Sequence, residues 1–169
     1  VRGIWACANP ECDQVDHDYR FEGRPFGRLF EDATCNCPCG GVVLELLYCF
    51  RCGDASLGGH RINELDDATR DCFIGALPDR EFNYPGRSAW LDYRWYRPKV
   101  ISVTTNNWDG AQIDFNFERV SLNPFTGQIK YGQNEDPQTG LALNGVKRKL
   151  DSPTVLALPS VCPNCGWED

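Results

Sequence analysis

The sequence lacks several features that define large classes of protein. Its 169 residues include no methionine, so we expect the chain to be processed or cut from a longer protein. The longest apolar run, 42–47, is interrupted by Glu45 and falls far short of the roughly 20 residues that span a bilayer. The sequence therefore predicts no membrane partner for these residues.

Positive charge is also scarce. The chain has 17 Lys and Arg against 24 Asp and Glu, which gives a formal net charge of -7. Proteins that bind nucleic acid tightly on their own usually carry a basic surplus, because they neutralise phosphates. Any contact with nucleic acid must therefore be confined to a local basic segment.

The motifs of common enzyme classes are missing as well. The dipeptide Gly-Lys never occurs, so there is no phosphate-binding loop of the ATPase type. With only two histidines, the chain has no H-E-x-x-H protease motif, and the deaminase pattern is absent too. We therefore expect no catalysis by this chain alone.

Cysteine, in contrast, is abundant, and it admits two explanations. Disulfide frameworks belong to oxidising compartments, whereas thiolate metal sites are typical of reducing ones. No asparagine begins an N-x-S/T glycosylation motif, and 169 residues bury enough core to fold without bridges. Both observations favour metal, and a cytoplasmic location. The cysteines are Cys7, Cys12, Cys35, Cys37, Cys39, Cys49, Cys52, Cys72, Cys162 and Cys165.

The spacing of the cysteines indicates zinc. Segments 49–53 and 162–166 are both C-x2-C-G hooks, in which glycine permits the turn that aims two sulfurs at one point. Segment 7–12 is a looser C-x4-C hook, and 35–40 contributes a fourth pair that again ends in Cys-Gly. Two such hooks that meet form a tetrahedral four-cysteine site.

The pairing of the hooks stays open at this point. The simplest nesting joins the 7–12 hook to Cys37 and Cys39, and the 49–52 hook to 162–165. An interleaved arrangement joins 7–12 to 49–52 instead, and Cys35 is an alternative to Cys37. We predict two Zn2+ ions, with the ligands Cys7, Cys12, Cys37, Cys39, Cys49, Cys52, Cys162 and Cys165.

The remaining cysteine and the two histidines are not predicted to bind metal. Cys72 has no cysteine nearby in the sequence and is predicted to be a buried core thiol. His17 and His60 are interpreted as exposed polar residues rather than ligands.

The hydrophobic patterns predict a mainly β fold with little helix, made of zinc-ribbon-like small β-sheets and hairpins held by the two four-cysteine sites. Segment 41–48 is a strand that leads into the 49–52 hook, and 111–120 alternates as a strand. A turn at 123–127 predicts a hairpin with 128–131. A further strand is expected over 99–105.

One helix is expected, over 63–70, with Asn63 as its N-cap. We divide the chain into a cysteine-rich zinc-knuckle module, 1–53, and a β-rich segment, 54–169. The second segment returns its C-terminal knuckle, 162–165, to the first, so the whole is expected to form one domain.

Segment 87–99, the aromatic and basic segment, has a composition that suits stacking on bases and neutralisation of phosphates. The alternative, which we favour for any single residue, is that the aromatic side chains pack a core strand while the arginines reach solvent. The candidate nucleic-acid contacts are Arg87, Trp90, Arg94, Trp95, Arg97 and Lys99.

The hooks and their flanks, 3–12 and 39–59, resemble the cysteine-rich region of large prokaryotic DEAD/DEAH-box helicases, as do 93–98, 117–127 and 162–166. One departure concerns the first site, because the position three before Cys39 is Asn36, so Cys37 or Cys35 must replace it.

The resemblance implies that the ATPase lobes lie outside these residues. The chain would then be a non-catalytic zinc-binding accessory domain of an ATP-dependent helicase-like protein. Its expected partners are the rest of the helicase chain and DNA or RNA. The alternative is a zinc-scaffolded protein interaction domain without nucleic-acid contact, and the third hypothesis is a secreted disulfide-rich protein.

Overall fold

The computed structural model describes residues 3–62, 71–77, 93–99, 113–114, 117–132, 139–143, 147–148, 162, 164–165 and 167. Within these residues the regular structure is antiparallel β, apart from one 3-10 turn, η1 (His17–Tyr19). The predicted fold class, mainly β with little helix, is confirmed. The strands are β1 (Trp5–Cys7), β2 (Leu29–Phe30), β3 (Val43–Tyr48), β4 (Ala55–Arg61), β5 (Cys72–Gly75), β6 (Tyr93–Pro98), β7 (Ile113–Asp114), β8 (Phe117–Leu122), β9 (Gln128–Tyr131), β10 (Thr139–Leu143) and β11 (Lys147–Arg148).

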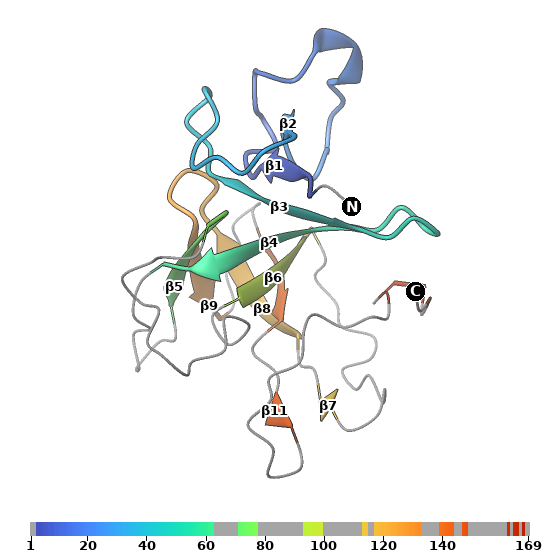
Figure 1. Cartoon of the computed structure of the whole chain (residues 1–169), viewed down its shortest axis with the longest axis vertical. Coiled ribbons are helices and arrows are strands. Elements are labelled where there is room, and N and C mark those ends of the chain that lie inside the picture. The colour runs from blue at the N-terminus through green and yellow to red at the C-terminus, as the bar shows by residue number, and fades with distance from the viewer. Residues whose placement is uncertain are drawn as a thin grey trace.

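Nine of these strands form a single sheet in the order β2-β1-β3-β4-β5-β9-β8-β10-β6 (Figure 1). Strand β4 is central to it, because it pairs first with β3 and then with β5. It also pairs with β6, through residues 57–60. The described residues contain no helix with the length and apolar character that a membrane span requires.

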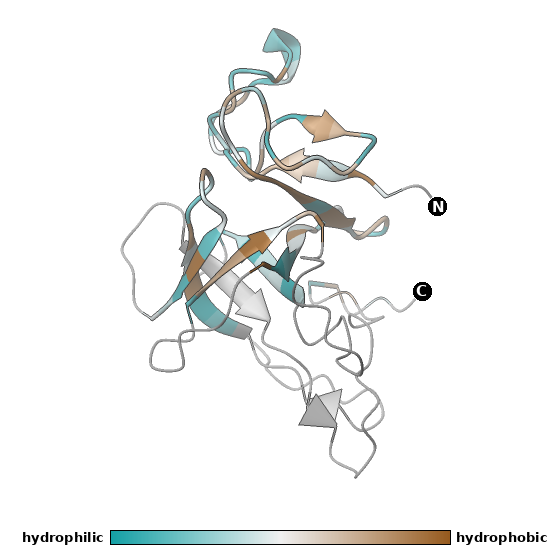
Figure 2. Cartoon of the chain, turned by 60° about the vertical axis from the view of Figure 1, so that its left-hand side comes forward, coloured by the Kyte–Doolittle hydropathy of each residue, from teal (hydrophilic) through white to brown (hydrophobic). Residues whose placement is uncertain are grey.

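Strands β1 and β3 separate two hydrophobic clusters. Side chains alternate between the two faces of a strand. Ala6 and Leu44 accordingly belong to the main core, whereas Cys7 and Val43, their neighbours in the chain, belong to a second cluster that contains buried cysteines. Figure 2 shows that β3, which lies between the N-terminal part and the rest, is hydrophobic over most of its length. The second cluster, which we call the cysteine-rich layer, therefore packs on the outer face of β1 and β3, opposite to the main core. Its buried residues are Cys7, Cys12, Cys37 and Val43.

The predicted hairpin at 123–127 is confirmed. Asn123 accepts hydrogen bonds on its side-chain oxygen from the amides of Phe125 (2.9 Å) and Thr126 (3.2 Å), which closes the turn between β8 and β9. Gly127 has a φ of 75°, a value that residues with a side chain rarely adopt. The turn residues thus supply the conformation that the sequence pattern predicts.

The pairing of β4 with its neighbours depends on a glycine. The Tyr93 hydroxyl of β6 donates a 2.7 Å hydrogen bond to Glu45 of β3, and it lies where a Cβ on Gly58 of β4 would be. Burial, followed by the nearby Glu45 carboxylate, raises the pKa of Tyr93 well above its usual value. A larger residue at position 58 would therefore break a hydrogen bond that connects strands on either side of β4.

The strand expected over 111–120 is divided in the structure. Strand β7 pairs with β11 in a separate two-stranded sheet, whereas β8 pairs with β9 and β10 in the large one. Alternation alone did not reveal this change of partner, because both pieces share the same period. Of the strand expected over 99–105, only Lys99 is described, and it lies in a turn with a φ of 63°. The helix expected over 63–70 lies outside the described residues.

Candidate metal centres

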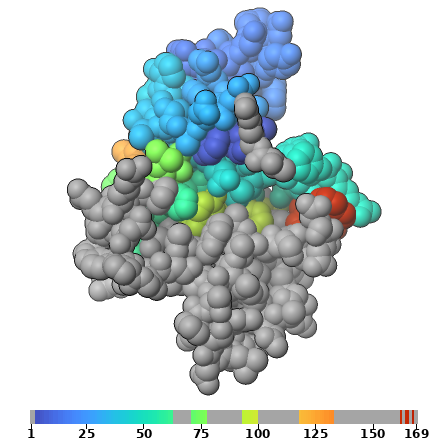
Figure 3. Space-filling model, in the orientation of Figure 1, coloured from blue at the N-terminus to red at the C-terminus, as the bar shows by residue number. Residues whose placement is uncertain are grey.

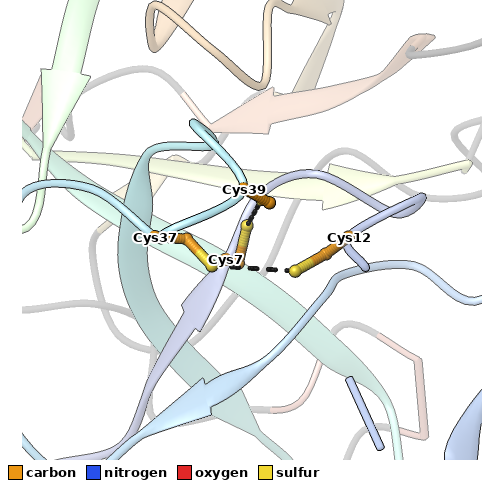
Figure 4. Close-up of side chains that lie close together, drawn as sticks. All are labelled: Cys7, Cys12, Cys37 and Cys39. Carbon is orange, nitrogen blue, oxygen red and sulfur yellow. Dashed lines mark hydrogen bonds between the residues drawn. The ribbon is translucent and has the colours of Figure 1, made fainter. Parts of the chain in front are cut away.

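Eight cysteines form two clusters of four. We call Cys7, Cys12, Cys37 and Cys39 the N-terminal tetrad, and Cys49, Cys52, Cys162 and Cys165 the C-terminal tetrad. Within each tetrad all four sulfurs lie within 4.8 Å of one another. This grouping is the simpler of the two pairings considered from the sequence. Figure 4 shows the side chains of the N-terminal tetrad converging from separate segments of the chain.

The sulfur separations fit a metal ion and do not fit disulfides. The separations are 3.5 Å for Cys7 and Cys39, and 3.6 Å for Cys12 and Cys37. In the C-terminal tetrad they are 3.8 Å for Cys49–Cys165 and 3.7 Å for Cys52–Cys162. A disulfide bond is about 2.05 Å long, whereas four sulfurs bound tetrahedrally at about 2.3 Å from zinc are about 3.8 Å apart. Both tetrads are therefore positioned to bind metal ions such as zinc.

Local turns position the ligands of the N-terminal tetrad. Cys7 ends β1, and the Cys12 amide donates to the Asn9 carbonyl at 3.2 Å, which closes the first hook. Gly40 has a φ of 88° and donates to the Cys37 carbonyl at 2.8 Å. A Cβ on Gly41 would lie 2.6 Å from the Cys7 sulfur. The two glycines thus permit the turn and the close approach of the hooks.

The C-terminal tetrad forms at the tip of the β3–β4 hairpin. Gly53 has a φ of 77°, and its amide donates to the Cys49 carbonyl at 2.9 Å, which gives the conformation expected of the C-x2-C-G hook. The second hook approaches from the other end of the chain. Figure 3 shows its described residues, in red, against the hairpin, in teal. This tetrad therefore joins segments that are far apart in the sequence.

The two tetrads differ in their exposure to solvent. In the N-terminal tetrad three cysteines are buried, and Cys39 is half-buried. In the C-terminal tetrad Cys52 and Cys165 are exposed, Cys49 is half-buried and Cys162 is buried. A metal ion in the N-terminal tetrad would consequently be better shielded from competing ligands and oxidants.

Each tetrad combines thiols whose pKa is shifted in opposite directions. Burial raises the pKa of Cys37 to about 11 and that of Cys162 to about 12. Burial opposes ionisation of Cys39 as well, but hydrogen bonds from the Gly41 amide and from neighbouring thiols lower its pKa to about 7. For Cys52 the Asn164 side chain donates to the sulfur at 3.5 Å and lowers the pKa to about 6. Metal binding must therefore displace protons from the buried thiols.

The remaining cysteines and both histidines lie outside the tetrads. The N-terminal tetrad contains Cys37 and not Cys35, which is exposed. Cys72 is 1% exposed in the main core, as its interpretation as a core thiol requires, and burial raises its pKa. His17 is exposed in η1, and the half-buried His60 packs edge-on against Tyr93 with ring centroids 5.0 Å apart.

The described part of the aromatic and basic segment, 93–99, lies largely inside the fold. Arg94 and Trp95 are 6% and 8% exposed, so their side chains offer little surface to bases or phosphates. Half-buried Arg97 forms an ion pair with Asp54 at 3.1 Å, and exposed Lys99 donates to the Gly23 carbonyl. Two further candidate contacts, Arg87 and Trp90, lie outside the described residues.

Three residues that support the tetrads from outside were not predicted from the sequence. The side chains of Asn9 and Asn164 donate to sulfurs of Cys39 and Cys52, and Arg24 bonds to backbone carbonyls of the first hook. Asn9 and Asn164 lie within hooks, so their position in the sequence could have indicated that their side chains lie near the sulfurs. Arg24 lies 12 residues beyond Cys12, in a loop with no motif.

Comparison with known proteins places the chain in a family. No curated protein and no solved structure matches it. The model of the YjiV N-terminal domain family matches residues 29–169, which include the whole C-terminal tetrad as well as Cys37 and Cys39. Because this match covers well over half of the chain, the protein belongs to the YjiV N-terminal domain family.

Proposed function

We propose that this chain is a structural zinc-binding module in which each tetrad holds one Zn2+ ion. The observation that supports this most strongly is the convergence of four sulfurs in each tetrad, all within 4.8 Å of one another. Zinc bound by four thiolates supplies folding free energy, and it leaves no open coordination position for catalysis.

Each ion would tie a different part of the chain to the sheet. The N-terminal ion would join the 7–12 hook to the 37–39 turn on the outer face of β1 and β3, where Cys7 and Val43 already pack together. The C-terminal ion would join the hairpin tip to the 162–165 hook. The eight thiols would thus restrain segments whose attachment otherwise depends on short strands and turns.

Elemental analysis of the purified protein tests this proposal. We expect two zinc ions per chain, one for each tetrad, and nearly all thiols to become reactive once the protein is denatured without reductant. A result below about one zinc per chain would contradict the proposal, because a structural site binds zinc tightly enough to keep the ion during purification. Few free thiols after denaturation would indicate the disulfide-rich alternative instead.

We also propose that the module serves as an accessory domain within a helicase-like ATPase. The support is the resemblance of segments 3–12 and 39–59, with their hooks, to the cysteine-rich region of DEAD/DEAH-box helicases. The rest of that protein would then be its first partner. Contact with DNA or RNA would fall to exposed positions such as Lys99, because Arg94 and Trp95 are buried.

Binding of labelled DNA at several salt concentrations tests the nucleic-acid contact. If Lys99 meets a phosphate, Lys99→Ala should weaken binding and reduce the slope of log K against log salt by about one. Lys130→Ala is the matched control, since Lys130 is also an exposed lysine but lies on β9, outside the aromatic and basic segment. No binding, or equal effects of the two variants, would favour the protein interaction alternative.

A further inference from the structure

A buried arginine lies against the first cysteine hook. Arg24 comes from the loop between β1 and β2 and is only 8% exposed. Its Nε donates to the Pro10 carbonyl, and its Nη2 donates to the Cys12 carbonyl at 2.5 Å. The guanidinium is thus held at the backbone that carries one ligand of the N-terminal tetrad.

The charge of this arginine has no acidic partner in the part of the chain that the structure describes. Ion pairs there, such as those of His17 with Asp18 and of Arg97 with Asp54, join other residues. Its Nη1 is buried and makes no hydrogen bond. Arginine stays protonated in proteins, and burying an uncompensated charge costs several kcal/mol. A negative charge close to Arg24 would remove this cost.

The N-terminal tetrad supplies such a charge when it holds a divalent metal ion, because four thiolates and one divalent cation carry a net charge of -2. We infer that Arg24 is the counter-charge and positioning residue of the N-terminal metal centre. This inference rests on the proposed zinc binding. Arg24 would act in two ways, by balancing the charge of the centre and by holding the 7–12 hook through two carbonyls.

The C-terminal tetrad shows why only one of the centres needs this arrangement. Two of its cysteines are exposed, so water can screen the negative charge of a metal bound there. Arg51, which lies within its hook, is itself exposed and makes no comparable pair of carbonyl contacts in the described residues. An effect of Arg24 should therefore be confined to the N-terminal centre.

The chain also offers a matched control for Arg24. Arg20 lies in the same loop and donates in the same way to two carbonyls, those of Val15 (2.7 Å) and Asp13 (2.5 Å). It is exposed, however, and its charge is therefore solvated. Comparing Arg24→Gln with Arg20→Gln separates the contribution of a buried charge from that of loop anchoring.

The test is a chelator titration of the full chain loaded with 113Cd2+, followed by cadmium NMR. Each centre gives its own signal, and Cys165→Ser identifies the C-terminal one. We expect Arg24→Gln to weaken binding at the N-terminal centre by about 10- to 100-fold, the range for residues that support metal ligands. The C-terminal centre should be unchanged, and Arg20→Gln should match the parent protein. Arg24→Lys should recover part of the loss, because it keeps the charge.

Other outcomes would overturn the inference. If Arg24→Gln binds cadmium as the parent protein does, Arg24 has no role at the centre. If Arg24→Gln and Arg24→Lys lose the same cadmium affinity at the N-terminal centre, the charge of Arg24 does not support metal binding. The same conclusion follows if Arg20→Gln loses as much affinity as Arg24→Gln. A parent protein that takes up no metal at the N-terminal tetrad would instead contradict the proposed zinc binding, so the two failures are distinguishable.

Discussion

A Cys12→Ser variant is expected to lose the N-terminal metal centre and, with it, the folded state of the cysteine-rich layer. Cys12 is fully buried, and its sulfur lies 3.6 Å from that of Cys37. A structural zinc ion in such a site contributes on the order of 10 kcal/mol to folding, whereas a whole domain is stable by only about 5–15 kcal/mol. The loss of one centre is therefore comparable with the entire stability of the protein.

Zinc analysis and thermal unfolding would measure this effect. Zinc should fall from two ions per chain to one, and proteolysis should cut residues 8–42 first. Cys35→Ser is the matched control, because Cys35 belongs to the same cysteine-rich segment but is exposed and outside the tetrad. If Cys12→Ser keeps both ions and melts with Cys35→Ser, the N-terminal tetrad is not a metal centre.

A Cys165→Ser variant is expected to release the C-terminal hook from the β3–β4 hairpin. The Cys165 sulfur lies 3.8 Å from that of Cys49, and the centre closes the 109 residues from 53 to 161. A covalent cross-link around a loop of about 100 residues stabilises a protein by about 4.7 kcal/mol through chain entropy. A metal link of the same span should restrain the unfolded chain to a similar extent. The free energy of unfolding should therefore fall by at least about 4–5 kcal/mol, and by up to the roughly 10 kcal/mol of a structural zinc site.

Denaturant unfolding and zinc analysis together would check this result. We expect one zinc ion to remain, in the N-terminal tetrad, because its ligands are separate from those of the C-terminal one. Asn164→Ala is a milder companion variant, since it removes only the donor to the Cys52 sulfur. A Cys165→Ser protein that unfolds like the parent chain would show that the C-terminal hook does not hold the fold together.

Local features of the fold were predictable because they depend on residues close together in the chain. Asn123 and Gly127 form the predicted turn through their own hydrogen bonds and φ, and Gly40 and Gly53 adopt the left-handed conformation that the hooks require. The strand that leads into Cys49 follows from a run of β-forming residues. For these elements tertiary contacts add stability without changing the local conformation.

Features that depend on strand partners could not be predicted in the same way. The pattern over 111–120 does not show that β7 and β8 belong to different sheets, because alternation reports which side chains share a face and not which strand lies alongside. The burial of Arg94 and Trp95 is likewise a property of β6 in its place beside β4 and β10. Their composition favoured a core strand for any single residue but did not exclude an exposed basic surface.

The sequence by itself determined that the chain is mainly β and that eight of its cysteines have the spacing of metal ligands, since hooks and strands are short-range structures. Only the tertiary structure decided which hooks meet, because the sulfurs of Cys49 and Cys165 lie 3.8 Å apart although the residues are 116 positions apart in the sequence. Only the tertiary structure, likewise, shows that Arg24 is buried against the first hook and has no acidic partner in the described residues. The energy of a buried charge depends on what surrounds it in space, and no spacing in the sequence encodes that.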